Sequence, residues 1–209
     1  LHEGYIEELS KLFDTNIITV EYRYFDQSMP SPCNWDYLTV ENSLYDLHHV
    51  NEALHALYKG KWMATGISKG GQTTMFYRSY FPNDVDISVP YVAPLNRSVE
   101  DGRHEKFLQY EVSTPENRRK VLDFQLLLFK RKAALLPMLE KYCNGKHYTF
   151  NGRLADIYDF AVFEYAFSFW QWGSDIQKIP TREADDLAVF KYWMSHCDPD
   201  YFSNQNPCF

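Results

Sequence analysis

A serine flanked by glycines is the first place in this sequence where residue types and spacing could do chemistry. The run from Gly66 to Gly71 is GISKGG, which fits the pattern G-x-S-x-G of a serine nucleophile on a sharp turn between a strand and a helix. Glycines two residues before and after Ser68 leave room for neighbouring backbone, and the turn predicts a positive φ at the serine. The N-terminus of the following helix favours negative charge, so the Lys69 N–H is the expected oxyanion donor. This arrangement predicts acyl transfer.

Two other uses of the same residues stay open from the sequence. Ser68 could be a helix N-cap in a turn whose glycines have no catalytic role. The glycines could also form a phosphate-binding turn, although the run lacks the G-x-x-x-x-G-K-[ST] pattern. The flanking segments favour the nucleophile, because residues 61–66 have the pattern of a short strand and residues 70–80 that of a helix.

A second candidate site precedes this motif. β-branched residues predict a buried strand over 17–22, which leads into a loop containing Glu21 and Arg23. In a doubly wound sheet this loop lies at the carboxyl edge, beside the serine. Glu21 and Arg23 occupy alternate strand positions and so point the same way. They predict either an ion pair that fixes the loop or a pair that binds substrate.

The elements that position these residues follow from hydrophobic periodicity. Up to about residue 96, helical and β-like stretches alternate, which predicts a parallel sheet with right-handed crossovers. We expect helices over 1–13, 44–57 and 70–80, and adjacent parallel strands over 17–22, 61–66 and 86–92. The sequence thus predicts an α/β segment over residues 1–97.

Strand patterns largely vanish in the second half of the chain. Long helical stretches are expected over 115–142, with a break at Pro137, and over 154–170 and 182–195. Residues 98–209 are therefore predicted to form a helical subdomain. Its aromatic stripe either packs into a core or lines a peptide cleft, and it comprises Phe160, Phe163, Phe167, Trp170 and Trp172. Glu164 lies within this stripe, where its carboxylate either faces solvent or pairs with a substrate's terminal ammonium.

Composition excludes several classes of function. Lys plus Arg total 21 against 28 Asp plus Glu, and the net charge of −7 disfavours a nucleic-acid partner. No apolar run approaches the ~18–20 residues that span a bilayer. The four cysteines lack the spacing of a zinc site. We expect neither a metal nor another cofactor. The pairing of the cysteines stays open, as does an oxidising compartment; they are Cys33, Cys143, Cys197 and Cys208.

Four segments carry a resemblance to a known family. EYRYFDQSMP, GISKGGQTTMFYRSYFPNDVD, VPYVAPLN and EYAFSFWQWG resemble the bacterial PS-10 peptidases, serine peptidase family S37. They are more distantly similar to family S28, that of lysosomal prolyl carboxypeptidase and dipeptidyl peptidase II. The resemblance implies an α/β-hydrolase fold with a helical cap inserted after the sixth strand of the sheet.

The resemblance also implies an activity. It points to a secreted or periplasmic serine aminopeptidase that releases di-, tri- or tetrapeptides from free N-termini, with a preference around proline. Ser68 would then be the nucleophile, and peptides would be the partners. The expected substrate-binding residues are Glu21, Arg23, Glu164 and Trp170. Glu21 and Arg23 match a Glu-His-Arg segment of the related families. In this chain Tyr22 stands where those families have the histidine. An esterase or lipase of the same fold and a catalytically dead, hydrolase-like binding protein are the alternatives.

A complete catalytic triad is not expected within this chain. The resemblance places the triad Asp and His on strands beyond Phe209, and the strand with the second oxyanion loop before Leu1. Three histidines follow Ser68 but lie in cap-like sequence, where solvated roles are expected: His104, His147 and His196. Asp186 and His196 fit the order Ser, Asp, His, but both lie on or near one helical stretch. The chain alone is therefore expected to be inactive.

Overall fold

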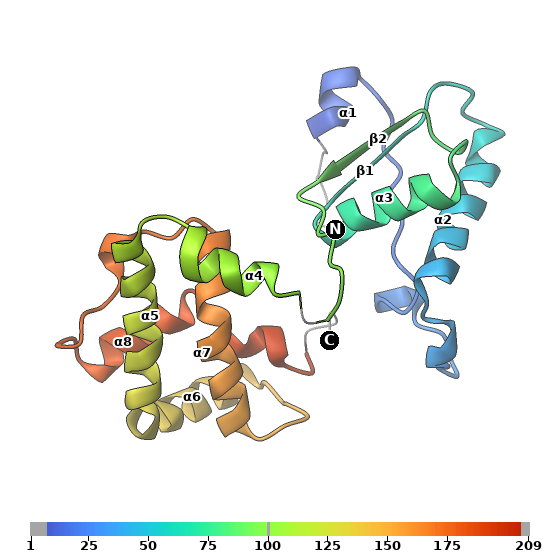
Figure 1. Cartoon of the computed structure of the whole chain (residues 1–209). Coiled ribbons are helices and arrows are strands. Elements are labelled where there is room, and N and C mark those ends of the chain that lie inside the picture. Colours follow the sequence, from blue (N-terminus) through green and yellow to red (C-terminus); the bar gives the residue numbers. More distant parts are fainter. Residues whose placement is uncertain (1–7, 100, 206–209) are drawn as a thin grey trace. The chain divides into compact units, whose positions relative to one another are not determined.

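The computed structural model describes residues 8–99 and 101–205, and the chain divides into two compact units between Arg97 and Ser98 (Figure 1). The structure is α/β, with many helices and a small parallel sheet. The first unit holds a small hydrophobic core and the second a larger one. The α/β-hydrolase fold and the assignment of residues 98–209 as a cap stay predictions.

The first unit is built on a two-stranded parallel sheet. Strand β1 (Met63–Ile67) pairs with β2 (Ile87–Tyr91), and Met63 lies opposite Ile87. Helix α3 (Lys69–Tyr80) connects the strands and packs on both, and α2 (Val40–His55) packs against α3. Helix α1 (Glu8–Phe13) comes first, and short 3-10 turns occupy Asp26–Ser28 and Trp35–Tyr37. Two of the three predicted strands are thus confirmed to within two residues.

The third predicted strand, residues 17–22, is wrong. Its β-branched residues suit a strand, but a strand requires a hydrogen-bonded neighbour. No described residue bonds to the backbone of residues 17–21, and β1 pairs with β2 alone. Ile17 and Ile18 are each 43% exposed rather than buried. Of the first predicted helix, residues 1–7 lie outside the described residues.

A polar cluster joins α2 to the turn between α3 and β2. Asp84 accepts a hydrogen bond from the Tyr77 hydroxyl at 2.6 Å, and His48 Nδ1 lies 2.7 Å from the same carboxylate oxygen. The His48 ring stacks on Phe81 with centroids 4.2 Å apart. Burial, with Asp84 as the second cause, raises the pKa of Tyr77 far above its ordinary value. These contacts give His48 a structural role.

The described part of the second unit consists of helices and the loops between them. Its helices are α4 (Arg103–Lys106), α5 (Pro115–Lys130), α6 (Lys132–Lys146), α7 (Leu154–Gln171) and α8 (Asp186–Met194). Short π and 3-10 turns occupy Phe107–Glu111, Ile176–Lys178 and Pro199–Phe202. No strand occurs within residues 101–205, as predicted for 115–195.

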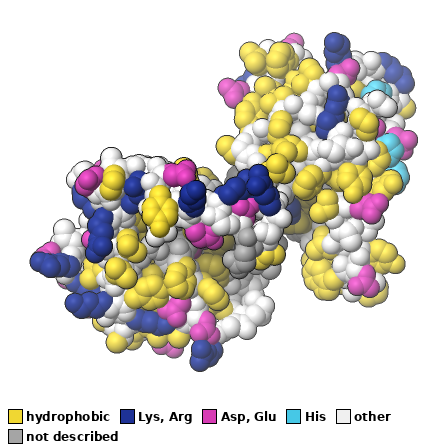
Figure 2. All heavy atoms as spheres, in the orientation of Figure 1, with side chains coloured by type: hydrophobic (Ala, Val, Ile, Leu, Met, Phe, Trp, Pro, Cys, Tyr) yellow, Lys and Arg dark blue, Asp and Glu magenta, His cyan; other side chains and the backbone are white. Residues whose placement is uncertain are grey.

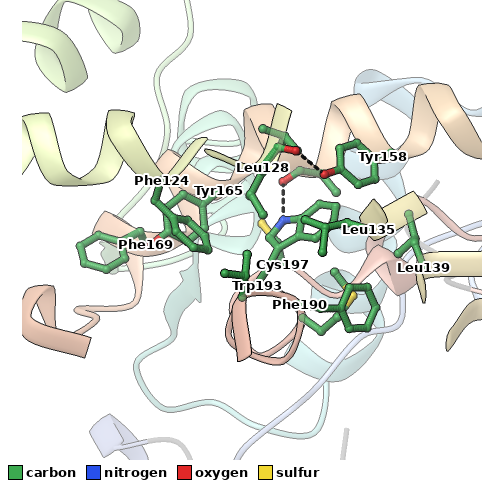
Figure 3. Close-up of a cluster of buried hydrophobic side chains, with 14 of the residues drawn as sticks. Phe124, Leu128, Leu135, Leu139, Tyr158, Tyr165, Phe169, Phe190, Trp193 and Cys197 are labelled. Atoms are coloured by element: carbon green, nitrogen blue, oxygen red, sulfur yellow. Dashed lines mark hydrogen bonds between the residues drawn. The ribbon is translucent and has the colours of Figure 1, made fainter. Parts of the chain in front are cut away.

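Aromatic side chains fill the core of the second unit (Figure 3). Tyr158 donates a hydrogen bond of 2.6 Å to the Leu128 carbonyl, and Trp193 Nε1 donates to the Ala161 carbonyl at 3.4 Å. These bonds satisfy the polar atoms of large buried side chains, whose burial would otherwise be costly. The core therefore joins α5, α7 and α8.

The long helical stretch 115–142 is interrupted at Arg131, and the predicted break at Pro137 is wrong. Pro137 lies inside α6. Arg131 separates α5 from α6, and its guanidinium donates to the carbonyls of Arg182 and Ala184 and to the Asp186 carboxylate. The residue at the break thus contacts polar partners that are distant in sequence, which no local pattern reveals.

Candidate active site

Ser68 occupies a sharp turn between the end of β1 and the start of α3. Its φ of 55° and ψ of −116° are outside the regions that side-chain-bearing residues favour, and such a conformation costs about 1–3 kcal/mol. The Ser68 N–H donates to the Tyr91 carbonyl at 3.0 Å, and the Ser68 carbonyl accepts from Gln72 N–H at 2.9 Å. The predicted strand–turn–helix geometry and positive φ are therefore present.

The Ser68 hydroxyl does not cap the helix that it precedes. In the part of the chain that the structure describes, three other α-helices have an N-cap side chain that accepts a backbone N–H: Thr39, Thr114 and Asp185. All three have extended φ and ψ, whereas Ser68 has a positive φ and makes no side-chain cap hydrogen bond. Ser68 is exposed, and no described residue hydrogen-bonds its hydroxyl. The geometry favours a nucleophile over an N-cap.

The glycines of the motif differ in how much space surrounds them. A Cβ at Gly66 would lie 2.4 Å from the Gly70 carbonyl carbon, and one at Gly71 would lie 2.6 Å from the Tyr91 carbonyl oxygen. A Cβ at Gly70 would meet nothing within 4 Å. The expectation of close backbone approach thus holds for Gly66 and is wrong for Gly70. The close approach at the following position, Gly71, lets α3 pack on the end of β2.

The loop that includes Tyr22 and Phe25 holds the first turn of α3. Lys69 Nζ lies 4.9 Å from the ring centroid of Tyr22 and 4.6 Å from that of Phe25, within the range of cation–π attraction. The Tyr22 hydroxyl donates to Thr73 Oγ1 at 2.8 Å, and Thr73 in turn donates to the Lys69 carbonyl at 3.0 Å. These contacts fix the residue whose N–H is the candidate oxyanion donor.

Glu21 and Arg23 do not pair with each other. Arg23 forms a bidentate ion pair with Asp46 of α2, with both N–O distances 2.7 Å, and donates to the Tyr37 carbonyl at 2.8 Å. Glu21 accepts hydrogen bonds from Ser28, from the backbone N–H at 3.0 Å and from the hydroxyl at 2.6 Å. Arg23 thus joins the loop to α2, and Glu21 closes it. The geometry favours the loop-fixing role over substrate binding.

The role of Arg23 leads to a prediction about stability. Arg23→Lys retains a positive charge but loses the planar fork, so we expect a loss of about 1 kcal/mol in the free energy of unfolding. Arg119→Lys on α5 is the matched control, because its ion pair with Asp123 is largely exposed and contributes little. Urea denaturation measures both. Equal stability of the two variants would contradict the loop-fixing role.

The three histidines downstream of Ser68 all lie in the second unit. His104 and His147 are exposed, as expected. His196 differs from expectation, since it is partly buried: its Nδ1 lies 2.9 Å from the Tyr192 carbonyl, and its ring packs 4.3 Å from that of Tyr192. The nearby Asp186 pairs with Arg131 instead. Asp186 and His196 therefore do not form an Asp–His pair.

The aromatic stripe of α7 is mostly outside the core. Three rings of the stripe on α7 are exposed, and these are Phe160, Phe163 and Phe167. Trp172, which follows the helix, is exposed as well. Figure 2 shows hydrophobic side chains at the surface of both units. Trp170 is partly buried and packs edge-on against Phe169. The core-packing interpretation is wrong for the three exposed phenylalanines.

Glu164 is a partly buried carboxylate on α7. Burial raises its pKa, and no described residue forms a hydrogen bond or ion pair with it. A charge without a partner in a partly desolvated place favours binding of a cation. Glu21, by contrast, already accepts two hydrogen bonds. Glu164 is therefore the better candidate for holding a ligand's ammonium group.

Two residues at the site were not found by sequence reasoning. Val92 follows β2 directly and has a φ of 41°, which is rare for a β-branched residue; its neighbour Tyr91 accepts the Ser68 N–H. Asp46 holds Arg23 from a helix 23 residues away in sequence. No local pattern indicates either residue. Among the cysteines, Cys33 is exposed, Cys143 and Cys197 are buried free thiols, and Cys208 lies outside the described residues.

Comparisons with known proteins show the family to which the chain belongs. The family model of the PS-10 peptidase S37 matches residues 4–198. The prolyl tri/tetrapeptidyl aminopeptidase of Streptomyces mobaraensis is 32% identical over 190 residues, which are 88% of this chain and 40% of that protein. The chain thus spans about two fifths of the length of this relative. No solved structure matches the chain. Among the described residues, no helix is both long and apolar enough to cross a membrane.

Proposed function

Because this chain belongs to the PS-10 peptidase S37 family, we propose that it provides the nucleophile of a serine peptidase and that Ser68 is that nucleophile. One observation carries the proposal: Ser68 stands exposed, at a φ of 55°, on the turn between β1 and α3. A capping serine needs no such conformation. Backbone strain of this kind is found at functional sites, and it supports a function of the hydroxyl.

The proposed reaction is acyl transfer through Ser68. A general base accepts the hydroxyl proton while Ser68 Oγ attacks the substrate carbonyl. The N-terminus of α3 and the Lys69 N–H stabilise the resulting oxyanion. The peptide C–N bond then breaks, the amine leaves with the proton from the base, and water hydrolyses the ester on Ser68. This chain supplies the nucleophile and one oxyanion donor.

We further propose that the substrates are peptides with free N-termini, and that short peptides are released with a preference around proline. The name of the Streptomyces relative supports this substrate class. The unpartnered carboxylate of Glu164 supports recognition of an ammonium group, and Trp170 on the same helix offers an apolar surface. A secreted or periplasmic location is proposed from the family resemblance alone.

Labelling with a fluorophosphonate tests the nucleophile. In an S37 polypeptide that contains residues 1–209, we expect the label on Ser68 and its loss in Ser68→Ala. Ser113 is the matched control, because it is also exposed and has a φ of 54°, but it precedes a helix of the second unit with no strand before it. Labelling that persists in Ser68→Ala would contradict the proposal.

Removal of the Glu164 charge is expected to weaken the binding of substrates with a free N-terminus. Loss of an ammonium partner should raise KM for peptides with free N-termini by roughly 10- to 100-fold in Glu164→Gln. Peptides with acetylated N-termini should be cleaved poorly by the unsubstituted enzyme. Glu140→Gln on α6 is the control, because Glu140 is an exposed carboxylate. Efficient cleavage of acetylated peptides would instead indicate an endopeptidase or an esterase.

The effect of Glu164 on stability follows from its raised pKa. A carboxyl whose pKa is higher in the folded state favours folding when protonated and loses that contribution as pH rises through the folded-state pKa. Glu164→Gln should therefore raise Tm at neutral pH and leave it nearly unchanged in acid. Thermal unfolding at several pH values measures this. A Tm difference that is independent of pH would show that the carboxyl is not desolvated.

A further inference from the structure

Two asparagines of the second unit are each followed by glycine, and the two pairs occupy different structures. Asn144–Gly145 lies within α6, whereas Asn151–Gly152 lies in the loop between α6 and α7. Asparagine before glycine is prone to deamidation, because glycine has no Cβ to hinder the approach of its backbone nitrogen to the asparagine side chain. The local structure of each pair decides whether that approach occurs.

The Asn151–Gly152 pair in the loop makes no hydrogen bond with any described residue. Both residues are exposed, and a Cβ at Gly152 would meet nothing within 4 Å. The Gly152 nitrogen is therefore not engaged by a carbonyl, and the Asn151 side chain can turn toward it.

The chain on either side of this pair is held in place. The Thr149 carbonyl accepts from Asn204 N–H at 2.8 Å, and Thr149 N–H donates to the Gln205 side-chain oxygen at 2.9 Å. After the pair, Arg153 is the N-cap of α7, and its carbonyl accepts the first N–H groups of that helix. Asn151 and Gly152 thus lie between two fixed points of the second unit.

The Asn144–Gly145 pair is held by α6. Both residues lie within the helix (Lys132–Lys146), where each backbone N–H donates to the carbonyl four residues earlier. A helical ψ of about −42° keeps the engaged Gly145 nitrogen from closing on Asn144 Cγ. Both residues are exposed, as are those of the loop pair. The two pairs therefore differ in backbone structure and not in access to water.

We propose that Asn151 is a modification site, at which the Gly152 nitrogen attacks Asn151 Cγ and water completes a deamidation. As the bond from the Gly152 nitrogen to Cγ forms, the bond from Cγ to the side-chain nitrogen breaks, and that nitrogen leaves as ammonia with the Gly152 proton. Water then opens the resulting succinimide ring. Attack of water on Cγ gives aspartate, and attack on the backbone carbonyl carbon gives isoaspartate. Water is the one co-reactant.

Either product changes the segment that leads into α7. A neutral amide becomes a carboxylate, which makes the net charge of −7 more negative by one. The new charge lies two residues before the N-cap Arg153, near the end of the helix that favours negative charge. Isoaspartate also adds a methylene to the backbone before the helix that carries Glu164. The proposal rests on the second unit alone and is independent of the role of Ser68.

Incubation of a folded S37 polypeptide that contains residues 1–209 in water enriched in oxygen-18 tests the site. Trypsin cleaves after Lys141, Lys146 and Arg153, so each asparagine falls in its own peptide for mass spectrometry, and a sample digested at once gives the baseline. Asn151 should become an acid that contains oxygen-18 at least tenfold faster than Asn144, because α6 holds the second pair. In guanidinium chloride, which unfolds both pairs, the two rates should agree. A ratio below tenfold in the folded protein would overturn the proposal.

Alanine at each glycine tests the route of the reaction. Gly152→Ala should slow conversion of Asn151 at least tenfold, because the added methyl hinders the attacking nitrogen. Gly145→Ala is the matched control and should leave the rate at Asn151 unchanged. An added Cβ meets nothing within 4 Å at either position. Equal rates at Asn151 in the two variants, or aspartate without isoaspartate as the product, would show direct hydrolysis of the amide and contradict attack by Gly152.

Discussion

Residues 1–209 on their own are expected to hydrolyse peptides roughly 10⁶-fold more slowly than an S37 polypeptide with a general base, since loss of the base costs about this much in a serine triad. No described residue hydrogen-bonds the Ser68 hydroxyl, so it stays protonated and weakly nucleophilic at neutral pH. Within the same unit, His48 Nδ1 is engaged by Asp84, and His55 stacks on Trp62 with centroids 5.1 Å apart. Among the described residues, no histidine forms a hydrogen bond with Ser68.

Fluorogenic peptides with free N-termini measure this activity, with Ser68→Ala as the background. We expect the chain and Ser68→Ala to be indistinguishable, while an S37 polypeptide that includes these residues is active. Hydrolysis by residues 1–209 that disappears in Ser68→Ala would show the opposite. Such hydrolysis would identify the base as one of the three histidines downstream of Ser68, which are His104, His147 and His196.

Alanine substitutions at the motif's glycines are expected to separate two kinds of position. Gly66→Ala and Gly71→Ala should each destabilise the first unit by roughly 3 kcal/mol, at the upper end of overpacking costs. In both cases the added methyl meets backbone atoms, at 2.4 Å and 2.6 Å respectively, and backbone cannot turn aside as a flexible side chain does. Gly70→Ala is the matched control, with nothing within 4 Å.

Urea denaturation followed by amide exchange in β1 and β2 distinguishes these variants. Gly70→Ala should be neutral or slightly stabilising, because alanine restricts the unfolded chain. Gly71→Ala should expose the amides at the end of β2 first, because α3 packs there. If Gly71→Ala were as stable as Gly70→Ala, the close contact between α3 and Tyr91 would be contradicted.

The turn at Ser68 could be predicted because its determinants are local. The strand, the glycines and the helix follow one another within 61–80, and each has a distinct period or composition. The strand predicted over residues 17–22 is absent, and it shows what local composition cannot determine. β-branched residues indicate a segment that suits a sheet, but they do not say which segment pairs with it. That partner is set by tertiary structure.

Other errors arose where partners are distant in sequence. Alternation placed Glu21 and Arg23 on one side of a strand, but the carboxylate that Arg23 contacts belongs to Asp46 on α2. Aromatic residues occur all round α7, so periodicity could not separate buried Tyr165 from exposed Phe163. In both cases the side chains have several suitable surroundings, and packing of the whole unit selects one.

The joint at Arg131 has a consequence for the order in which the second unit folds. Its guanidinium partners lie 51 to 55 residues later in the chain. The contacts of this guanidinium therefore form only after a loop of this length has closed, and the cost of closure precedes the gain from them. Helix formation in α5 and α6 should be early, and their mutual docking late. Polypeptides that end before residue 182 should hold both helices but lack the contacts that the Arg131 guanidinium makes at the joint between them.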